Sequence, residues 1–234
     1  MSKIPKRADC LDVENTVCVA NGIKVFARDN NPKELIGHWK FDDKYSLDYS
    51  GTSNHMTPPP EVGPQSGSSN KLPQNLIFSG GKGYSAFFDG FTYSNISHNK
   101  IYESEDMTIA FWVFLLKDST GSWRTILHKG NTTRDLTPTV MLWPKERRLH
   151  IRLSTDQNPN EGLDSKSVIP MRRWTHIAVS FSLQLLHLYV NGILDNQVIL
   201  KGSVMVKFIT FVKVLNKTIS IIKVLSILAK IIGI

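Results

Sequence analysis

Residues 172–192, RRWTHIAVSFSLQLLHLYVNG, alternate apolar and other residues through two successive runs. The apolar positions on one side of this alternation are Ile177, Val179, Phe181, Leu186, Leu188 and Val190. Asn191 and Gly192 follow, and both residue types readily adopt the positive φ angles that a two-residue hairpin turn requires. A period of two residues fits extended strands and not helices. The segment therefore predicts paired antiparallel strands with one face packed on a core.

Short segments of the same kind recur throughout residues 35–202, with turn-forming residues between them. Residues 107–116 are apolar on both faces, which is typical of a central strand that is covered on both sides. Residues 147–154 read as a half-buried strand with His150 and Arg152 facing outward. No sustained 3.6-residue period is present, so the pattern predicts an all-β antiparallel sandwich or barrel.

Composition divides the chain into three parts. Residues 1–34 are mixed and polar, and we interpret them as a leader or the remnant of a preceding unit. Residues 35–202 form the predicted body, interrupted at residues 57–74 by a stretch rich in Pro, Gly and Ser that predicts an exposed loop. Residues 203–234 form an atypical tail, rich in Val, Ile and Leu.

Charge is distributed unevenly along the 234 residues, which hold 28 Lys and Arg against 20 Asp and Glu. The tail contains five lysines and no acidic residue, so the other 202 residues hold 23 basic and 20 acidic residues. A nearly neutral body argues against a nucleic-acid partner. The two cysteines, Cys10 and Cys18, are too few for a disulfide framework and fit no common zinc pattern.

The tail admits three interpretations. Its lysines fall broadly on one side of a helix, which would suit a cationic amphipathic helix on a membrane surface. Residues 206–214 could instead form one more strand. The tail could also be something other than the natural end of this domain. The opening residues contain no continuous apolar segment and do not read as a signal peptide.

Several motifs in the body carry a resemblance to a known family. These are LIGHWKFDDKYSLDYSGTSNH with Asp48, the Phe88-Asp89-Gly90 turn, the strand around Trp112, and the pair RRWTHIAVSF and LHLYVNG. In this order they resemble laminin-G-like jelly-roll domains of the concanavalin A-like lectin/glucanase superfamily. The resemblance implies a two-sheet antiparallel jelly-roll sandwich over about residues 35–200. We expect Trp39, Phe88, Trp112 and Val179 to share its interior.

The sequence departs from the family after Gly202, where nothing matches the strand that usually closes the sandwich. Two outcomes remain open: the tail supplies a substitute, such as KFITFVKV at residues 207–214, or the sandwich lacks its closing strand. An uncovered edge beside an apolar tail would favour aggregation.

The sequence offers no catalytic constellation. Glu103, Glu105 and Asp106 form the one close acidic cluster of the body, but they precede a strand where the family has a surface turn. A polysaccharide hydrolase of the glucanase type would need a carboxylate pair on a strand, so we expect no catalytic residue and treat hydrolysis as the alternative.

The resemblance implies a non-catalytic recognition module at a surface or in the extracellular space, as part of a larger product, with a carbohydrate or protein ligand. Trp123 and Trp143 are the candidate ligand-binding residues, because they fall near predicted strand ends and could stack on sugars, although both could equally be core. A spacer without a ligand of its own is a further alternative.

Calcium is the ion that the resemblance implies, with Asp48 and Asp89 as candidate ligands and Asp42 next. The other interpretation is that these aspartates form hydrogen-bonded turns. Asn95 and Asn131 begin glycosylation sequons in predicted loops, which matter only if the chain is secreted.

Overall fold

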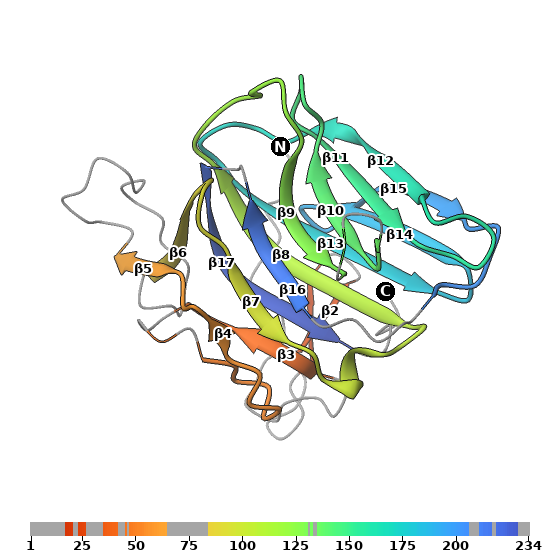
Figure 1. Ribbon diagram of the computed structural model, residues 1–234, viewed down its shortest axis with the longest axis horizontal. Coiled ribbons are helices and arrows are strands. Elements are labelled where there is room, and N and C mark those ends of the chain that lie inside the picture. The colour runs from red at the N-terminus through yellow and green to blue at the C-terminus, as the bar shows by residue number, and fades with distance from the viewer. Residues whose placement is uncertain are drawn as a thin grey trace, which may run out of the picture.

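The computed structural model is built almost wholly from antiparallel strands (Figure 1). It describes residues 17–20, 23–26, 35–41, 45, 47–64, 84–130, 132, 135–205, 211–216 and 219–228. Helical structure within these ranges is one short 3-10 turn, η1 (Lys100–Tyr102). No helix in the described part of the chain has the length and apolar character needed to cross a membrane.

Two large sheets make up the body. The seven-stranded sheet has the order β12 (Glu161–Val168), β11 (Arg148–Leu153), β10 (Thr139–Leu142), β9 (Arg124–Lys129), β16 (Phe211–Asn216), β7 (Ser94–Ser97) and β4 (Met56–Thr57). The eight-stranded sheet has the order β15 (Ile193–Ile199), β14 (Leu185–Val190), β13 (Trp174–Ser182), β8 (Met107–Leu115), β17 (Ile219–Leu228), β6 (Tyr84–Asp89) and β5 (Glu61–Pro64), with β3 (Leu35–Trp39) also paired to β17. The predicted antiparallel two-sheet sandwich is confirmed.

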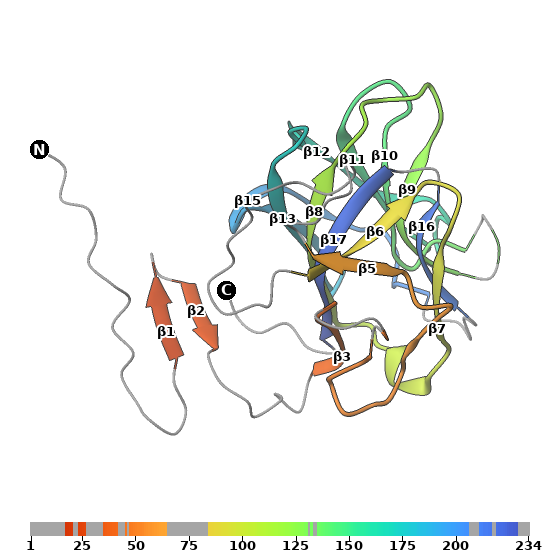
Figure 2. The ribbon, with the colours of Figure 1, turned by 90° about the vertical axis from the view of Figure 1, so that its left-hand side faces the viewer.

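A separate hairpin precedes the sandwich. Its strands, β1 (Val17–Ala20) and β2 (Ile23–Phe26), pair with each other in a two-stranded sheet of their own (Figure 2). Both strands belong to residues 1–34, which the sequence sets apart from the body.

The alternating segment forms β13, β14 and the turn into β15, as predicted. Its six inward positions are Ile177, Val179, Phe181, Leu186, Leu188 and Val190, of which the first five are buried and the last packs against the core. Asn191 and Gly192 have φ angles of 53° and 78°, so the hairpin turn has the expected left-handed backbone at both residues.

The tail supplies a strand to each sheet. β16 lies between β9 and β7, with Val212 opposite both Lys129 and Ile96. β17 pairs with β8 on one side and with β6 and β3 on the other. The helical interpretation of the tail is therefore wrong for the described residues 211–216 and 219–228, and the sandwich has closing strands after all.

One continuous core fills the space between the sheets. Trp39, Phe88 and Val179 are buried in it, as expected. Trp112 is not, and this expectation was wrong. Phe111 and Val113 take the inward positions of β8, so the alternation of the strand turns Trp112 to the outer face of its sheet, where its ring centroid lies 5.0 Å from that of His176.

The stretch rich in Pro, Gly and Ser is not a loop throughout. Residues 61–64 form β5, which pairs with β6 at one end of the eight-stranded sheet. A strand at this position has one unpaired side, which tolerates a proline. Residues 65–83 lie outside the described part of the chain.

Deleting residues 206–234 should abolish the fold, because β16 and β17 occupy interior positions in both sheets. We expect the shortened chain to lose the cooperative thermal transition that the full chain shows by circular dichroism. Deleting residues 1–30, which removes the separate hairpin, is the matched control and should keep that transition. A shortened chain that unfolds as cooperatively as the full chain would contradict the observed topology.

Candidate functional site

Three aromatic rings gather on the outer face of the seven-stranded sheet. Trp123 is 40% exposed, Trp143 is half-buried and His150 is buried. The ring centroids of the two tryptophans lie 4.9 Å apart, and that of His150 lies 4.6 Å from Trp123 and 5.1 Å from Trp143. We call these three residues the aromatic surface. The structure thus brings together the two tryptophans that the sequence singled out and adds a histidine.

Strand register explains the cluster. Arg124 of β9 pairs with Leu142 of β10, so the residues that flank this pair, Trp123 and Trp143, are cross-strand neighbours. His150 belongs to β11, where it pairs with Met141, two residues before Trp143. Diagonal neighbours at this separation lie within reach of large side chains. The cluster therefore follows from three consecutive antiparallel strands.

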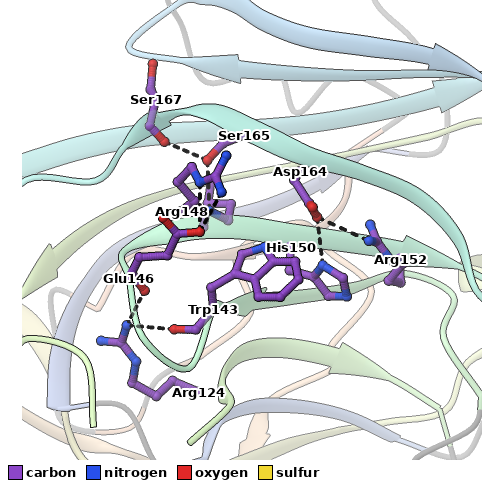
Figure 3. A network of polar contacts seen from close by, with 10 residues as sticks. Arg124, Trp143, Glu146, Arg148, His150, Arg152, Asp164, Ser165 and Ser167 are labelled. Atoms are coloured by element: carbon purple, nitrogen blue, oxygen red, sulfur yellow. Dashed lines mark hydrogen bonds and ion pairs between the residues drawn. The ribbon is translucent and has the colours of Figure 1, made fainter. Parts of the chain in front are cut away.

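A polar network adjoins the rings (Figure 3). The Nδ1–H of His150 donates a hydrogen bond to Asp164 Oδ1 over 2.7 Å, and Arg152 Nη2 lies 3.2 Å from the same oxygen. Arg152 Nη1 also donates to the carbonyl oxygen of Leu163 over 3.0 Å. Sequence reasoning predicted the outward direction of His150 and Arg152 but missed Asp164, which no local motif marks.

His150 is held as a neutral imidazole. Burial lowers its pKa below the ordinary value of 6.5, and the positive charge of Arg152 lowers it further, while the contact with Asp164 acts in the opposite direction. With the proton on Nδ1, Nε2 is an acceptor at neutral pH. The aromatic surface therefore contains one fixed hydrogen-bond acceptor beside its tryptophan rings.

The buried side chain of Arg124 supports the backbone that carries the aromatic surface. The side chain is 1% exposed, and its Nη2 donates to the carbonyl oxygens of Trp143 over 3.3 Å and Glu146 over 2.8 Å (Figure 3). Nη1 donates to the carbonyl oxygen of Asp118 over 3.2 Å. One buried guanidinium thus joins the loop between β8 and β9 to the turn between β10 and β11, and fixes the backbone of Trp143.

Asp48, the first candidate calcium ligand, is the centre of a turn. Its Oδ1 accepts from the backbone N–H groups of His38 and Ser50, each over 2.9 Å. Its Oδ2 accepts from the Ser50 hydroxyl over 2.9 Å, the Thr52 hydroxyl over 2.7 Å and the Asn54 N–H over 3.0 Å. Burial would raise the pKa of Asp48, but these hydrogen bonds outweigh it and hold the pKa below its usual value. Both oxygens are taken by donors.

Asp89, the second candidate, ends β6 and forms its own turn. Its Oδ1 accepts from the backbone N–H groups of Phe91 and Thr92, each over 2.8 Å, and from the Thr92 hydroxyl over 2.9 Å. These backbone hydrogen bonds lower the pKa of Asp89. Each aspartate therefore has the hydrogen-bonded turn that the sequence left open as the other interpretation.

The two aspartates do not meet. Asp89 pairs with Ile219 of β17, whereas Trp39, which bridges to Asp48, pairs with Leu225. Six residues of strand separate the two places by about 20 Å. No group of three or more His, Cys, Asp or Glu suited to a metal occurs among the described residues. These residues do not fit the calcium site expected from the sequence, and Asp42 lies outside the described ranges.

The remaining candidates lie apart from the aromatic surface. Glu103 and Glu105 occupy the turn between η1 and β8, where Glu103 Oε1 lies 3.1 Å from His98 Nε2. Asn95 lies in β7 and not in a loop, with β16 and β4 on either side. Its half-buried place in a sheet is a poor one for a glycan. Asn131 lies outside the described part of the chain.

Comparison with known proteins identifies the fold. The sequence profile of a family described as the concanavalin A-like lectin/glucanases superfamily matches residues 88–210. No curated protein matches the sequence. The matched range includes the whole aromatic surface and stops before β16.

Several solved structures resemble the chain at low sequence identity. The binding domain of botulinum neurotoxin DC in complex with rat synaptotagmin II has a TM-score of 0.64 and 17% identity, over 88% of this chain and 50% of that one. The same domain in complex with SialylT has a TM-score of 0.63 and 16% identity, over 86% and 49%. Botulinum neurotoxin type C, whose cell entry is dependent upon interaction with two ganglioside molecules, has a TM-score of 0.60 and 15% identity, over 86% and 49%. The chain spans about half the length of these proteins.

The hydrogen bonds to Asp48 generate a stability prediction. Replacing Asp48 with Asn should lower the free energy of unfolding by about 2 kcal/mol at pH 7, because charge-assisted bonds are lost and buried donors lose an acceptor. Since the folded-state pKa is depressed, the ionised carboxyl stabilises the fold above the unfolded pKa of about 3.9, and this contribution is lost as the pH falls through the lower folded value.

Urea denaturation of both proteins at pH 7 and near pH 2 measures this effect. The gap between Asp48→Asn and the unchanged protein should shrink at the lower pH. Glu105→Gln, an exposed carboxyl in a turn, is the control and should leave stability unchanged at both values. A gap that is absent at pH 7 would show that the turn does not depend on the Asp48 charge.

Proposed function

Because this chain belongs to the concanavalin A-like lectin/glucanases superfamily, we propose that it is a non-catalytic recognition module that binds carbohydrate on its aromatic surface. The observation that carries the proposal is the exposed Trp123 ring, packed beside Trp143 and His150 on the outer face of a rigid sheet. The sheet fixes the rings before any ligand arrives, which lowers the entropic cost of binding.

The chemistry of the surface suits a sugar. A pyranose has an apolar face of C–H groups and a rim of hydroxyls, so it needs a flat ring beside directional polar groups. Trp123 supplies the ring, and the neutral His150 supplies an acceptor at Nε2 for a hydroxyl. Asp164 is 33% exposed at its side chain and can accept from a second hydroxyl.

The comparisons support a binding role. Two of the solved structures that the chain resembles are binding domains, one in complex with rat synaptotagmin II and one in complex with SialylT. By analogy with them, we propose that this chain binds a carbohydrate or a protein. We place it at a surface or in the extracellular space, as part of a larger product. Their low identity shows the fold alone, so the site rests on the aromatic surface itself.

The hydrolase alternative lacks a carboxylate pair in the right place. Glu103 and Glu105 sit in a turn, and Glu103 contacts His98. Retaining and inverting glycosidases place two carboxyl groups on either side of a bound sugar. Around the aromatic surface, Asp164 is already shared between His150 and Arg152. This arrangement supports binding and not turnover.

A protein ligand is the second candidate, favoured by one observation. The end of the eight-stranded sheet exposes Leu183, Ile193 and Ile199, which are 91%, 73% and 74% exposed. Exposed apolar side chains of this kind can bind a protein partner. Binding of a protein that competes with no glycan would favour this surface, and a chain that binds neither class would be a spacer.

Replacing Trp123 with Ala should weaken glycan binding about tenfold, because an exposed aromatic anchor contributes more than 1 kcal/mol to binding. A glycan array identifies the bound sugars, and calorimetry with the strongest of them measures the dissociation constant. Tyr189→Ala removes a half-buried aromatic from β14 in the other sheet and should leave binding unchanged. An array on which no glycan is bound would refute the proposal.

Glycan binding should also weaken as the pH falls from 7 through the lowered pKa of folded His150. His150 has a lowered pKa and stays neutral near pH 7, while protonation at lower pH turns the Nε2 acceptor into a donor. The fold also loses stability in this range, because the unfolded histidine takes up its proton at a higher pH than the folded one. Calorimetry with His150→Gln should show a flatter dependence on pH; an equal dependence in both proteins would place the titrating group elsewhere.

A further inference from the structure

A cleft opens beside the aromatic surface, at the end of the sandwich where the turn between β6 and β7 meets the loop between β8 and β9. Its volume is about 350 Å³, within the range of small-ligand sites. The residues that bear on its chemistry are Asp89, Phe91, Lys117, Asp118, Ser122 and Arg124. We call it the rim cleft.

Arg124 gives the rim cleft a buried cation with an unmet hydrogen bond. The side chain is 1% exposed, and its three hydrogen-bond acceptors are all backbone carbonyl oxygens. Its Nε–H is buried and has no hydrogen-bond partner among the described residues. Burial lowers the pKa of Arg124, and the attraction of Asp118 does not offset that cost. A guanidinium stays charged in proteins, so the site carries a positive charge, and no carboxylate among the described residues forms an ion pair with it.

The carboxylates of the cleft have partners within the protein, whereas Lys117 and the Nε–H of Arg124 have none among the described residues. Asp118 Oδ2 lies 2.6 Å from Arg147 Nη1, and Asp89 Oδ1 accepts three hydrogen bonds within its own turn. Lys117 is exposed, and no carboxylate in the described part of the chain forms an ion pair with it. The two aspartates and the two cations of the cleft balance in formal charge, so the features that favour an anion are the unpaired Lys117 ammonium and the unmet Nε–H of Arg124.

The other lining groups suit a sugar. Phe91 is 87% exposed, an unusual exposure for a large apolar ring, and it offers a face on which a pyranose can stack. Ser122 is exposed and offers a hydroxyl. Ser122 and Arg124 are the two chain neighbours of Trp123, so the cleft and the aromatic surface are joined at consecutive residues. The ligand proposed below would have to span both.

We propose that the rim cleft binds an anionic sugar residue, bearing a carboxylate or a sulfate, and that the glycan on the aromatic surface is therefore an acidic oligosaccharide. This inference rests on the proposed function and adds the charge of the ligand to it. Lys117 and Arg124 bind the anionic group, and Phe91 packs against the ring that carries it.

The test compares neutral and acidic forms of the same glycans. The full chain is applied to an array on which each neutral core is printed beside its sialylated form and its sulfated form. We expect at least one acidic form to bind about tenfold more tightly than its neutral core, as measured by calorimetry on the strongest pair. Preference for the sialylated or for the sulfated form identifies the anionic group, and either preference supports the proposal.

Variants at exposed residues test whether the rim cleft is the source of the preference for acidic glycans. Lys117→Glu should lower the affinity for the acidic glycan to about that of its neutral core, and leave the affinity for the neutral core unchanged. Phe91→Ala should weaken the acidic glycan more than the neutral one. Lys100→Glu makes the same charge change at an exposed residue of η1, outside the cleft lining, and should have no effect on either glycan.

The outcomes separate this inference from the proposed function. Equal affinity for neutral and acidic forms, with binding still weakened in Trp123→Ala, would overturn the acidic ligand and leave the aromatic surface in place. An acidic preference that Lys117→Glu does not reduce would overturn the rim cleft as its origin. Absence of any glycan binding would overturn the proposed function, and this inference with it.

Discussion

The fold depends on the pairing of its last two strands. β16 separates β9 from β7, and β17 separates β8 from β6 and β3. Without them, the seven-stranded sheet would divide into a four-stranded and a two-stranded piece. The eight-stranded sheet would divide likewise and would also lose β3, which pairs with β17. The contacts that join the early strands to the late ones are thus supplied from the far end of the sequence. Such long-range pairing costs loop-closure entropy, which burial of one common core offsets.

The aromatic surface belongs to the part of the sandwich that is built locally. β9, β10, β11 and β12 follow one another along the chain and lie side by side in the same order. Consecutive antiparallel pairing fixes their register, and the register brings Trp123, Trp143 and His150 together. Arg124 then couples this surface to the rim cleft, because the guanidinium that holds the Trp143 backbone also lines the cleft. The two places therefore share one rigid support.

The aspartates show why a residue type does not define a site. Asp48 and Asp89 are both carboxylates in loops next to strands, as calcium ligands often are. In the structure, five donors surround Asp48 and three surround a single oxygen of Asp89. Each carboxylate stabilises its own turn, and about 20 Å of strand separates the two. The number of donors around a carboxylate depends on the folded backbone, which composition and spacing do not reveal.

The sequence by itself determined the strands at residues 107–116, 147–154 and 172–192, the inward residues of β11, β13 and β14, and the Asn191-Gly192 turn. These features follow from the two-residue repeat of an extended backbone and from local turn preferences, which a short segment carries within itself. Only the tertiary structure decided that Trp112 faces outward, that the tail supplies strands to both sheets, and that Asp164 and Arg124 adjoin the aromatic surface. A strand with two apolar faces does not specify which face is buried, and a strand in a distant segment does not specify its neighbours. The buried face of each strand and its neighbours in the sheet are set only when all segments bury their apolar area in one common core.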